Sequence, residues 1–185
     1  MGSDRMLPGT GSLLAIGAGL ALLGSGPAAM AGEGKVSVED CLDTVLDQLG
    51  GEAWHLEYES RGGVPIYEFV LHTDQENYYV ACDARTGTLA EVDVIVEEDD
   101  ARWQAAAKID EDTATQTALD RYKGEVEEIK RLLLSSGGVA YEVDIEIPNA
   151  NGEFNVYVDA VTGAISQVNH EYWEIGQPAP RLENG

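Results

Sequence analysis

Basic residues are scarce in this sequence of 185 residues. Lysine and arginine total 11 against 34 aspartates and glutamates, and the formal net charge is −23 at pH 7. A surface this negative repels phosphate, so nucleic acid and anionic membranes are poor candidate partners. The acidic residues are spread along the chain, which favours a solvated acidic surface over a single binding tail. Whether the acidity reflects a saline habitat or cation binding stays open.

Long apolar segments are missing as well. The main run of apolar residues and glycines spans residues 13–23. As a helix it would reach about 16 Å, against ~30 Å for a hydrocarbon core. Arg5 precedes the run, and helix breakers and the tripeptide Ala29-Met30-Ala31 follow it, as at a signal-peptidase site. We therefore expect a signal peptide (1–31), a periplasmic or extracellular location, and no stable membrane span after its removal.

Catalytic motifs are absent from the sequence. It contains no H-E-x-x-H, no G-x-S-x-G and no glycine-rich phosphate loop. The three histidines, His55, His72 and His170, are scattered and do not recur at equivalent positions. We therefore expect no catalytic residues, no cofactor and a function other than that of an enzyme.

An internal repeat organises the rest of the chain. Residues 67–71 (YEFVL) resemble residues 141–145 (YEVDI), and residues 78–87 (YYVACDARTG) resemble residues 154–163 (FNVYVDAVTG). The offset changes by two residues between these blocks, within a polar loop, where repeats absorb changes of length. After the signal peptide we expect a first repeat (36–96), an acidic linker (97–108), a second repeat (109–172) and a C-terminal tail (173–185).

Each copy predicts one helix followed by strands. Apolar residues recur at helical spacing from position 38 to 49, after a start at Ser37 or Asp40 and before a glycine pair at 50–51. The second helix is expected from near Asp110 to Gly124. Alternating apolar residues in the later blocks predict strands. The fold class is therefore α+β, with two tandem repeats that each pack one helix on a curved antiparallel sheet of three to four strands.

The repeated D-A-x-T-G predicts a turn. Asp83 and Asp159 are placed to accept hydrogen bonds from backbone N–H groups two or three residues on, and Gly87 and Gly163 to adopt a positive φ. A metal loop would need several oxygen ligands, and each copy offers one carboxylate. No metal site is expected here.

These motifs resemble the PepSY family. A helix ending in glycine, then Tyr-x-Val/Phe-x-Ile/Leu, then Tyr/Phe-x-Val-x-x-D-A-x-T-G occurs twice, across residues 36–172. The resemblance implies a helix on a curved antiparallel sheet, a location outside the cytoplasm and no catalytic residues. The family is similar to propeptide segments of secreted metallopeptidases, whose proposed role is inhibition or assisted folding of the peptidase. The implied partner is an extracytoplasmic protein, either a peptidase or a sensor domain.

The two cysteines occupy apolar positions of the repeat. Cys41 aligns with Ala114 on the helix, and Cys82 aligns with Val158 on a strand, so both should point into one core. In an exported protein such a pair can oxidise, and the bridge would then close a loop of about 42 residues. The alternative is two free buried thiols.

Strand alternation places Val70, Tyr79 and Tyr157 opposite the helix-facing side chains. We expect them on an exposed face that contacts a protein partner. Alternatively, the two sheets pack on one another and these residues fill the seam. The sequence as a whole predicts an exported, non-enzymatic module that restrains, escorts or regulates an extracytoplasmic protein, possibly a secreted peptidase. The alternative is an acidic cation-binding or structural envelope protein of a halophile. The oligomeric state is not predicted.

Overall fold

The computed structural model describes residues 35–177. The predicted signal peptide and the end of the C-terminal tail lie outside the described residues. No helix in the described part is long and apolar enough to cross a membrane.

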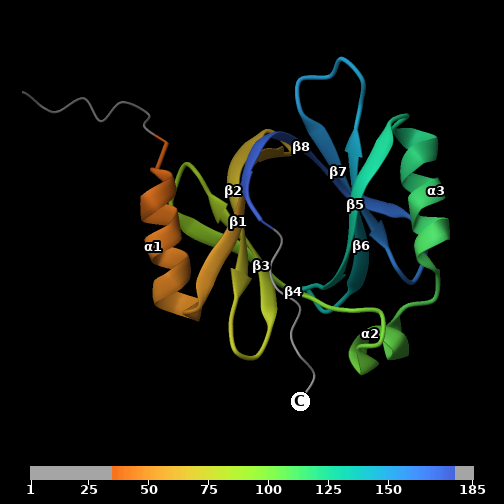
Figure 1. Cartoon of the computed structure of the whole chain (residues 1–185), viewed down its shortest axis with the longest axis horizontal. Coiled ribbons are helices and arrows are strands. Elements are labelled where there is room, and N and C mark those ends of the chain that lie inside the picture. Colours follow the sequence, from red (N-terminus) through yellow and green to blue (C-terminus); the bar gives the residue numbers. More distant parts are fainter. Residues whose placement is uncertain (1–34, 178–185) are drawn as a thin grey trace, which may run out of the picture. The chain divides into compact units, whose positions relative to one another are not determined.

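Each repeat contributes one main helix and four strands (Figure 1). The elements of the first repeat are α1 (Val38–Leu49), β1 (Glu52–Arg61), β2 (Val64–His72), β3 (Asn77–Asp83) and β4 (Thr88–Ile95). The elements of the second repeat are α3 (Glu111–Arg121), β5 (Glu125–Leu133), β6 (Val139–Glu146), β7 (Glu153–Asp159) and β8 (Ile165–Gly176). A short helix that we did not anticipate, α2 (Ala101–Ala106), lies within the segment expected to be a linker. Strand β8 continues past residue 172, where the second repeat was expected to end.

Local sequence explains where both main helices begin. The Ser37 hydroxyl accepts a hydrogen bond from the backbone N–H of Asp40, and the Asp110 carboxylate accepts one from that of Thr113. Gly50 ends α1 with a φ of 70°, a conformation that a side chain disfavours. Helix α3 ends at Arg121, earlier than the expected stop at Gly124.

The eight strands form a single closed antiparallel sheet. Neighbours in sequence pair with one another, and β8 pairs with β1 to complete the circuit. The two joins between repeats differ in length. The β1–β8 join runs from His55–Gly176 to Arg61–Asn169, whereas the β4–β5 join has only the pairs Val94–Leu133 and Ile95–Leu132. The two groups of four strands are therefore one sheet.

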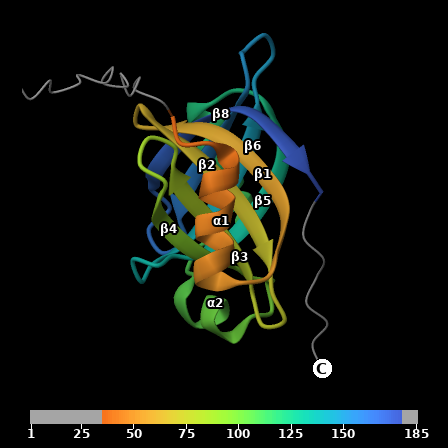
Figure 2. The same cartoon turned by 90° about the vertical axis from the view of Figure 1, so that its left-hand side faces the viewer.

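The outer face of this sheet carries two apolar cores, one under each main helix. Helix α1 lies across the strands of the first repeat (Figure 2) and buries Cys41 and Val45 against Val80 and other strand residues. Helix α3 buries Ala114 and Ala118 in the same way on the second repeat. Because successive strand residues point to opposite faces, the remaining side chains project into the space that the sheet encloses.

Candidate functional site

The face opposite the helices is interior. Val70, Tyr79 and Tyr157 retain only 5%, 1% and 4% of their exposed area and pack together with Leu132 inside the sheet. Our expectation that these side chains are exposed is wrong. They fill the space between the two repeats, as in the alternative, but within one closed sheet rather than between two packed sheets. Alternation distinguishes the two faces of each strand, but closure of the sheet decides that the second face is also buried.

The enclosed space is strongly acidic. Seven carboxyl side chains are buried in the described part of the chain: Glu57, Glu59, Glu68, Asp93, Glu142, Asp144 and Glu171. The expectation that the acidic residues form a solvated surface is wrong for this group. An isolated charge is costly to bury, so these carboxyl groups need bonding partners, protons or cations.

Glu57 on β1 is the most fully bonded of these carboxylates. Its Oε1 lies 2.7 Å from the Tyr79 hydroxyl, and its Oε2 accepts a hydrogen bond of 2.9 Å from Nδ2 of Asn155. The Tyr79 hydroxyl is also 3.0 Å from Glu142 Oε1. This network joins both repeats, because Glu57 and Tyr79 come from the first and Asn155 and Glu142 from the second.

Two basic side chains offset part of the acidic charge. Lys130 Nζ lies 2.7 Å from Asp144 Oδ2 and 3.9 Å from both Glu57 Oε1 and Glu142 Oε1. Arg61 bonds to the carboxylates of Glu59, Glu68 and Glu91. Glu57 pairs with Glu68 across β1 and β2, and Lys130 pairs with Glu142 across β5 and β6. Glu57 and Lys130 therefore occupy equivalent positions of the two repeats and carry opposite charges.

The remaining carboxyl groups are shifted toward their neutral forms. Burial raises the pKa of Glu59 to about 7 and that of Glu171 to about 8, with neighbouring carboxylates adding to both shifts. Burial also raises the pKa values of Glu68 and Glu142 well above their usual range. Glu57 is the exception. Burial opposes its ionisation, but the charge of Lys130 and hydrogen bonds from His55 and Tyr79 outweigh that effect and lower its pKa.

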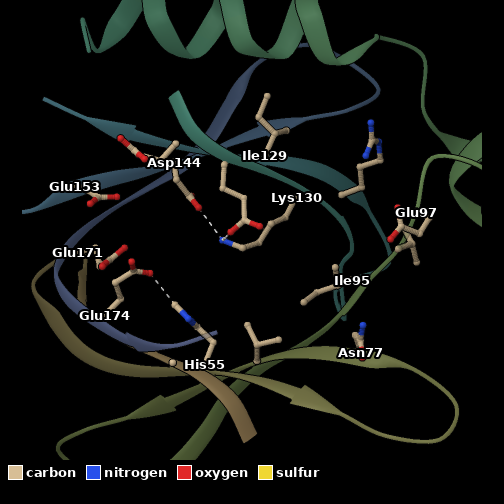
Figure 3. A pocket seen from close by; sticks show the side chains of 16 residues that line it. His55, Asn77, Ile95, Glu97, Ile129, Lys130, Asp144, Glu153, Glu171 and Glu174 are labelled. Carbon is tan, nitrogen blue, oxygen red and sulfur yellow. Dashed lines mark hydrogen bonds and ion pairs between the residues drawn. The ribbon is translucent and has the colours of Figure 1, made fainter. Parts of the chain in front are cut away.

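A cavity of about 650 Å³ opens at one end of the acidic interior (Figure 3). Ile95 and Lys130 line it from β4 and β5, the neighbouring strands with the short join. His55 and Glu174 line it from the paired ends of β1 and β8, and Asp144 lines it from β6. His55 Nε2 is 2.9 Å from Glu174 Oε2 and 3.4 Å from Glu57 Oε1. The mouth therefore brings an imidazole and several carboxylates together.

A second feature lies on the outside of the sheet, along the β1–β8 join. A register shift after Tyr58 places two successive β8 residues, Tyr172 and Trp173, beside the Tyr58 ring. Tyr67 on β2 also contacts that ring, with centroids 5.3 Å apart. Tyr172 and Trp173 remain 41% and 43% exposed, and Ile175 is 60% exposed. We call Tyr58, Tyr67, Tyr172 and Trp173 the aromatic surface.

The structure contains the Cys41–Cys82 disulfide, which ties α1 to β3 across a sequence separation of 41 residues. In the D-A-x-T-G turns, Asp83 accepts a hydrogen bond from the backbone N–H of Arg85, and Asp159 accepts two from those of Val161 and Thr162. Gly87 and Gly163 have φ values of 70° and 74°.

Sequence reasoning did not single out Glu57, His55, Lys130 or Glu174 as site residues. One signal was available for the interior. Glu68 and Glu142 occupy matching positions of the two repeats, on the same strand faces as Val70 and Tyr157. Matched charges on a face that also carries apolar residues indicate a shared polar interior.

The fold and the site define a small α+β module whose two repeats enclose one acidic interior. A sequence profile described as "Peptidase propeptide and YPEB domain" (PepSY) matches residues 35–93 and 108–167. The chain therefore belongs to the PepSY family, with two tandem domains. Domains of this family are extracytoplasmic and typically serve as non-catalytic regulatory or binding modules. The disulfide is consistent with export, because such bridges persist in oxidising compartments.

Two crystal structures show similarity to this chain. A protein of Clostridium difficile 630 described as a lipoprotein is 19% identical, with a TM-score of 0.33, and the match covers 76% of this chain and 96% of that one. A DUF2874 family protein from Bacteroides uniformis ATCC 8492 is 12% identical, with a TM-score of 0.33, and the match covers 73% and 89% of the two chains. A comparison with curated protein sequences gives no significant match.

Proposed function

We propose that this protein is exported to the periplasm or the cell exterior, where it restrains a secreted peptidase without being an enzyme itself. The description of the family as a peptidase propeptide domain supports a peptidase as the partner. The match of both repeats supports a chain built from two such modules. Neither the family nor the burial of seven carboxyl groups supports a structural envelope protein of a saline habitat.

The observation that carries this proposal is the aromatic surface. Helix α1 packs mainly on β2–β4, and α3 packs on β6 and β7, so neither main helix covers the β1–β8 join. Tyrosine and tryptophan are the residues most enriched at the energetic centres of protein interfaces. Three aromatic rings gather around that of Tyr58, and two of them are more than 40% exposed, which suits a protein partner.

Charge supports the choice of partner. With a net charge of −23, this chain attracts and orients a protein whose contact surface is basic. The partner should therefore be a peptidase with lysines and arginines around an apolar contact area. The same charge disfavours nucleic acid as a ligand.

An inhibition assay tests the proposal. Purified protein is added to the extracytoplasmic fraction of a host strain that lacks the gene, and casein hydrolysis is measured. We expect hydrolysis to slow in a saturable way. Trp173→Ala should raise the concentration needed by about tenfold or more, since a central interface tryptophan contributes about 2 kcal/mol or more.

Val161→Ala is the matched control. Val161 is another exposed apolar residue, at 46%, but it lies in the turn between β7 and β8, away from the aromatic surface. This variant should inhibit like the wild type, and thermal unfolding should show that both variants are folded. Hydrolysis that is unaffected by the wild-type protein, or slowed equally by Trp173→Ala, would contradict the proposal.

The predicted signal peptide has its own test. Mass spectrometry of protein from the native host should find a mature chain that begins near Gly32. Soluble protein that retains Met1 would argue against export.

A further inference from the structure

The mouth of the acidic cavity has the composition of a metal site. His55 and Glu57 alternate on β1 and so point to the same side of the strand, and Glu174 faces Glu57 across the β1–β8 pairing. We infer that His55, Glu57 and Glu174 bind one divalent transition metal ion of the zinc type. This inference is independent of the proposed peptidase partner, which concerns the outer face of the same strands.

The separations between the ligand atoms fit such an ion. Zinc bonds to imidazole nitrogen and carboxylate oxygen at about 2.0–2.1 Å, so neighbouring ligand atoms of a tetrahedral site lie about 3.3–3.5 Å apart. His55 Nε2 is 3.4 Å from Glu57 Oε1 and 2.9 Å from Glu174 Oε2, and one ligand atom of each residue lies within 4.8 Å of the other two. Small side-chain adjustments therefore complete a three-ligand site whose fourth position faces the cavity.

The buried ligand is already oriented. Glu57 is only 2% exposed, and its two oxygens are held by the Tyr79 hydroxyl and the Asn155 amide. Hydrogen bonds of this kind to a ligating carboxylate hold its orientation and typically change metal affinity 10–100-fold. The ion would meet a carboxylate on β1 that is already held in place, with the largely exposed carboxylate of Glu174 as a second ligand.

A second, separate observation points to a ligand in this cavity. Asp144 is 94% buried and points into the same space (Figure 3), yet its Oδ1 has no hydrogen-bond partner among the described residues. Its Oδ2 is bonded to Lys130. A buried acceptor without a donor is unfavourable, so the described protein groups alone do not satisfy the polar atoms around this cavity.

The surrounding charge also favours a cation. Lys130 is the nearest basic side chain, with its ammonium 3.9 Å from Glu57 Oε1, but Asp144 and Glu128 hold that ammonium more closely, at 2.7 and 3.2 Å. Glu153 and Glu171 line the same cavity. The imidazole selects for zinc and similar ions over calcium and magnesium, which prefer all-oxygen sites.

Titration calorimetry tests the inference. The full chain, without a polyhistidine tag and freed of metal by a chelator, is titrated with zinc chloride. We expect a single saturable site that calcium does not compete for. His55→Gln and Glu174→Gln should each weaken binding about tenfold or more, because each removes one of three protein ligands. Cobalt in place of zinc should show the visible absorption of a tetrahedral site, and His55→Gln should abolish it.

His72→Gln and His170→Gln are the matched controls, because these histidines lie outside the cavity. Both should bind zinc like the wild type. Because Glu174 is 56% exposed, Glu174→Gln should leave the fold intact and decides the question even where His55→Gln destabilises the protein. After chelator treatment, Glu174→Gln and the wild type should have the same melting temperature. Binding that Glu174→Gln leaves unchanged, or weak binding that all three histidine variants reduce equally, would overturn the inference.

Discussion

The acidic interior makes the stability of this protein depend on pH in a defined direction, and Asp93 reports it most cleanly. Asp93 lies on β4, is 3% exposed and accepts a hydrogen bond of 2.7 Å from the backbone N–H of Ser135. Burial raises the pKa of Asp93 to about 6, and the nearby Glu91 adds to the shift. The bond from Ser135 and the charge of Arg61 oppose it but do not cancel it.

The sign follows from proton linkage. The folded-state pKa of about 6 lies above the ordinary value of 3.8, so between these pH values the folded chain holds a proton that the unfolded chain has released. The stabilisation from this proton is complete below the ordinary value and is lost as the pH rises through about 6. The full shift corresponds to about 3 kcal/mol, which we reduce to about 2 kcal/mol for partial screening by solvent.

Asp93→Asn removes this dependence, because the amide stays neutral and keeps an oxygen that can accept the Ser135 bond. Relative to the wild type, the variant should gain about 2 kcal/mol of unfolding free energy between about pH 4 and about pH 7.5. Urea unfolding followed by tryptophan fluorescence, with chelator present, measures this difference. Asp47→Asn, at an exposed position of α1, is the control and should follow the wild-type profile.

The wild-type protein should lose more stability with rising pH than Asp93 alone would cause. Glu59 and Glu171 also have raised pKa values, of about 7 and about 8. Its stability should therefore fall as the pH rises from about 5 to about 8. A stability that increases over this range, or an Asp93→Asn variant whose profile runs parallel to that of the wild type, would refute the reasoning.

Two further predictions concern the cores. Replacing both Cys41 and Cys82 with alanine should lower the free energy of unfolding by up to about 4 kcal/mol, since the bridge constrains a long loop of the unfolded chain. An unchanged urea midpoint would contradict this. Tyr79→Phe should cost about 1–3 kcal/mol, because two carboxylates lose a shared hydroxyl donor. Tyr172→Phe, on the exposed outer face, should cost little in the same urea-unfolding assay.

Features encoded by neighbouring residues could be predicted from the sequence. Ser37 and Asp110 cap their helices because a short side-chain oxygen reaches a backbone N–H three residues on. The positive φ of Gly87 and Gly163 follows from the turn between two strands. The internal repeat placed Cys41 and Cys82 in one core, because equivalent positions of the second copy are apolar.

The candidate sites depend on contacts between distant parts of the chain. The site at the cavity mouth needs β8 to pair with β1, and Glu174 is more than 100 positions from Glu57 in the sequence. The aromatic surface needs the register shift that puts both Tyr172 and Trp173 on the outer face. A pattern that alternates strictly would have assigned one of them to the interior.

Apart from the register shift in β8, the sequence by itself determined which residues share a strand face, where the helices begin and that the chain is a tandem repeat. Only the tertiary structure decided which face meets water. A four-stranded sheet with one covering helix leaves its other face to solvent, as we expected for Val70, Tyr79 and Tyr157. Closure of both repeats into one sheet buries that face and its carboxylates together. The physical reason is that alternation is a local property of a strand, whereas burial depends on which strands pair at a distance.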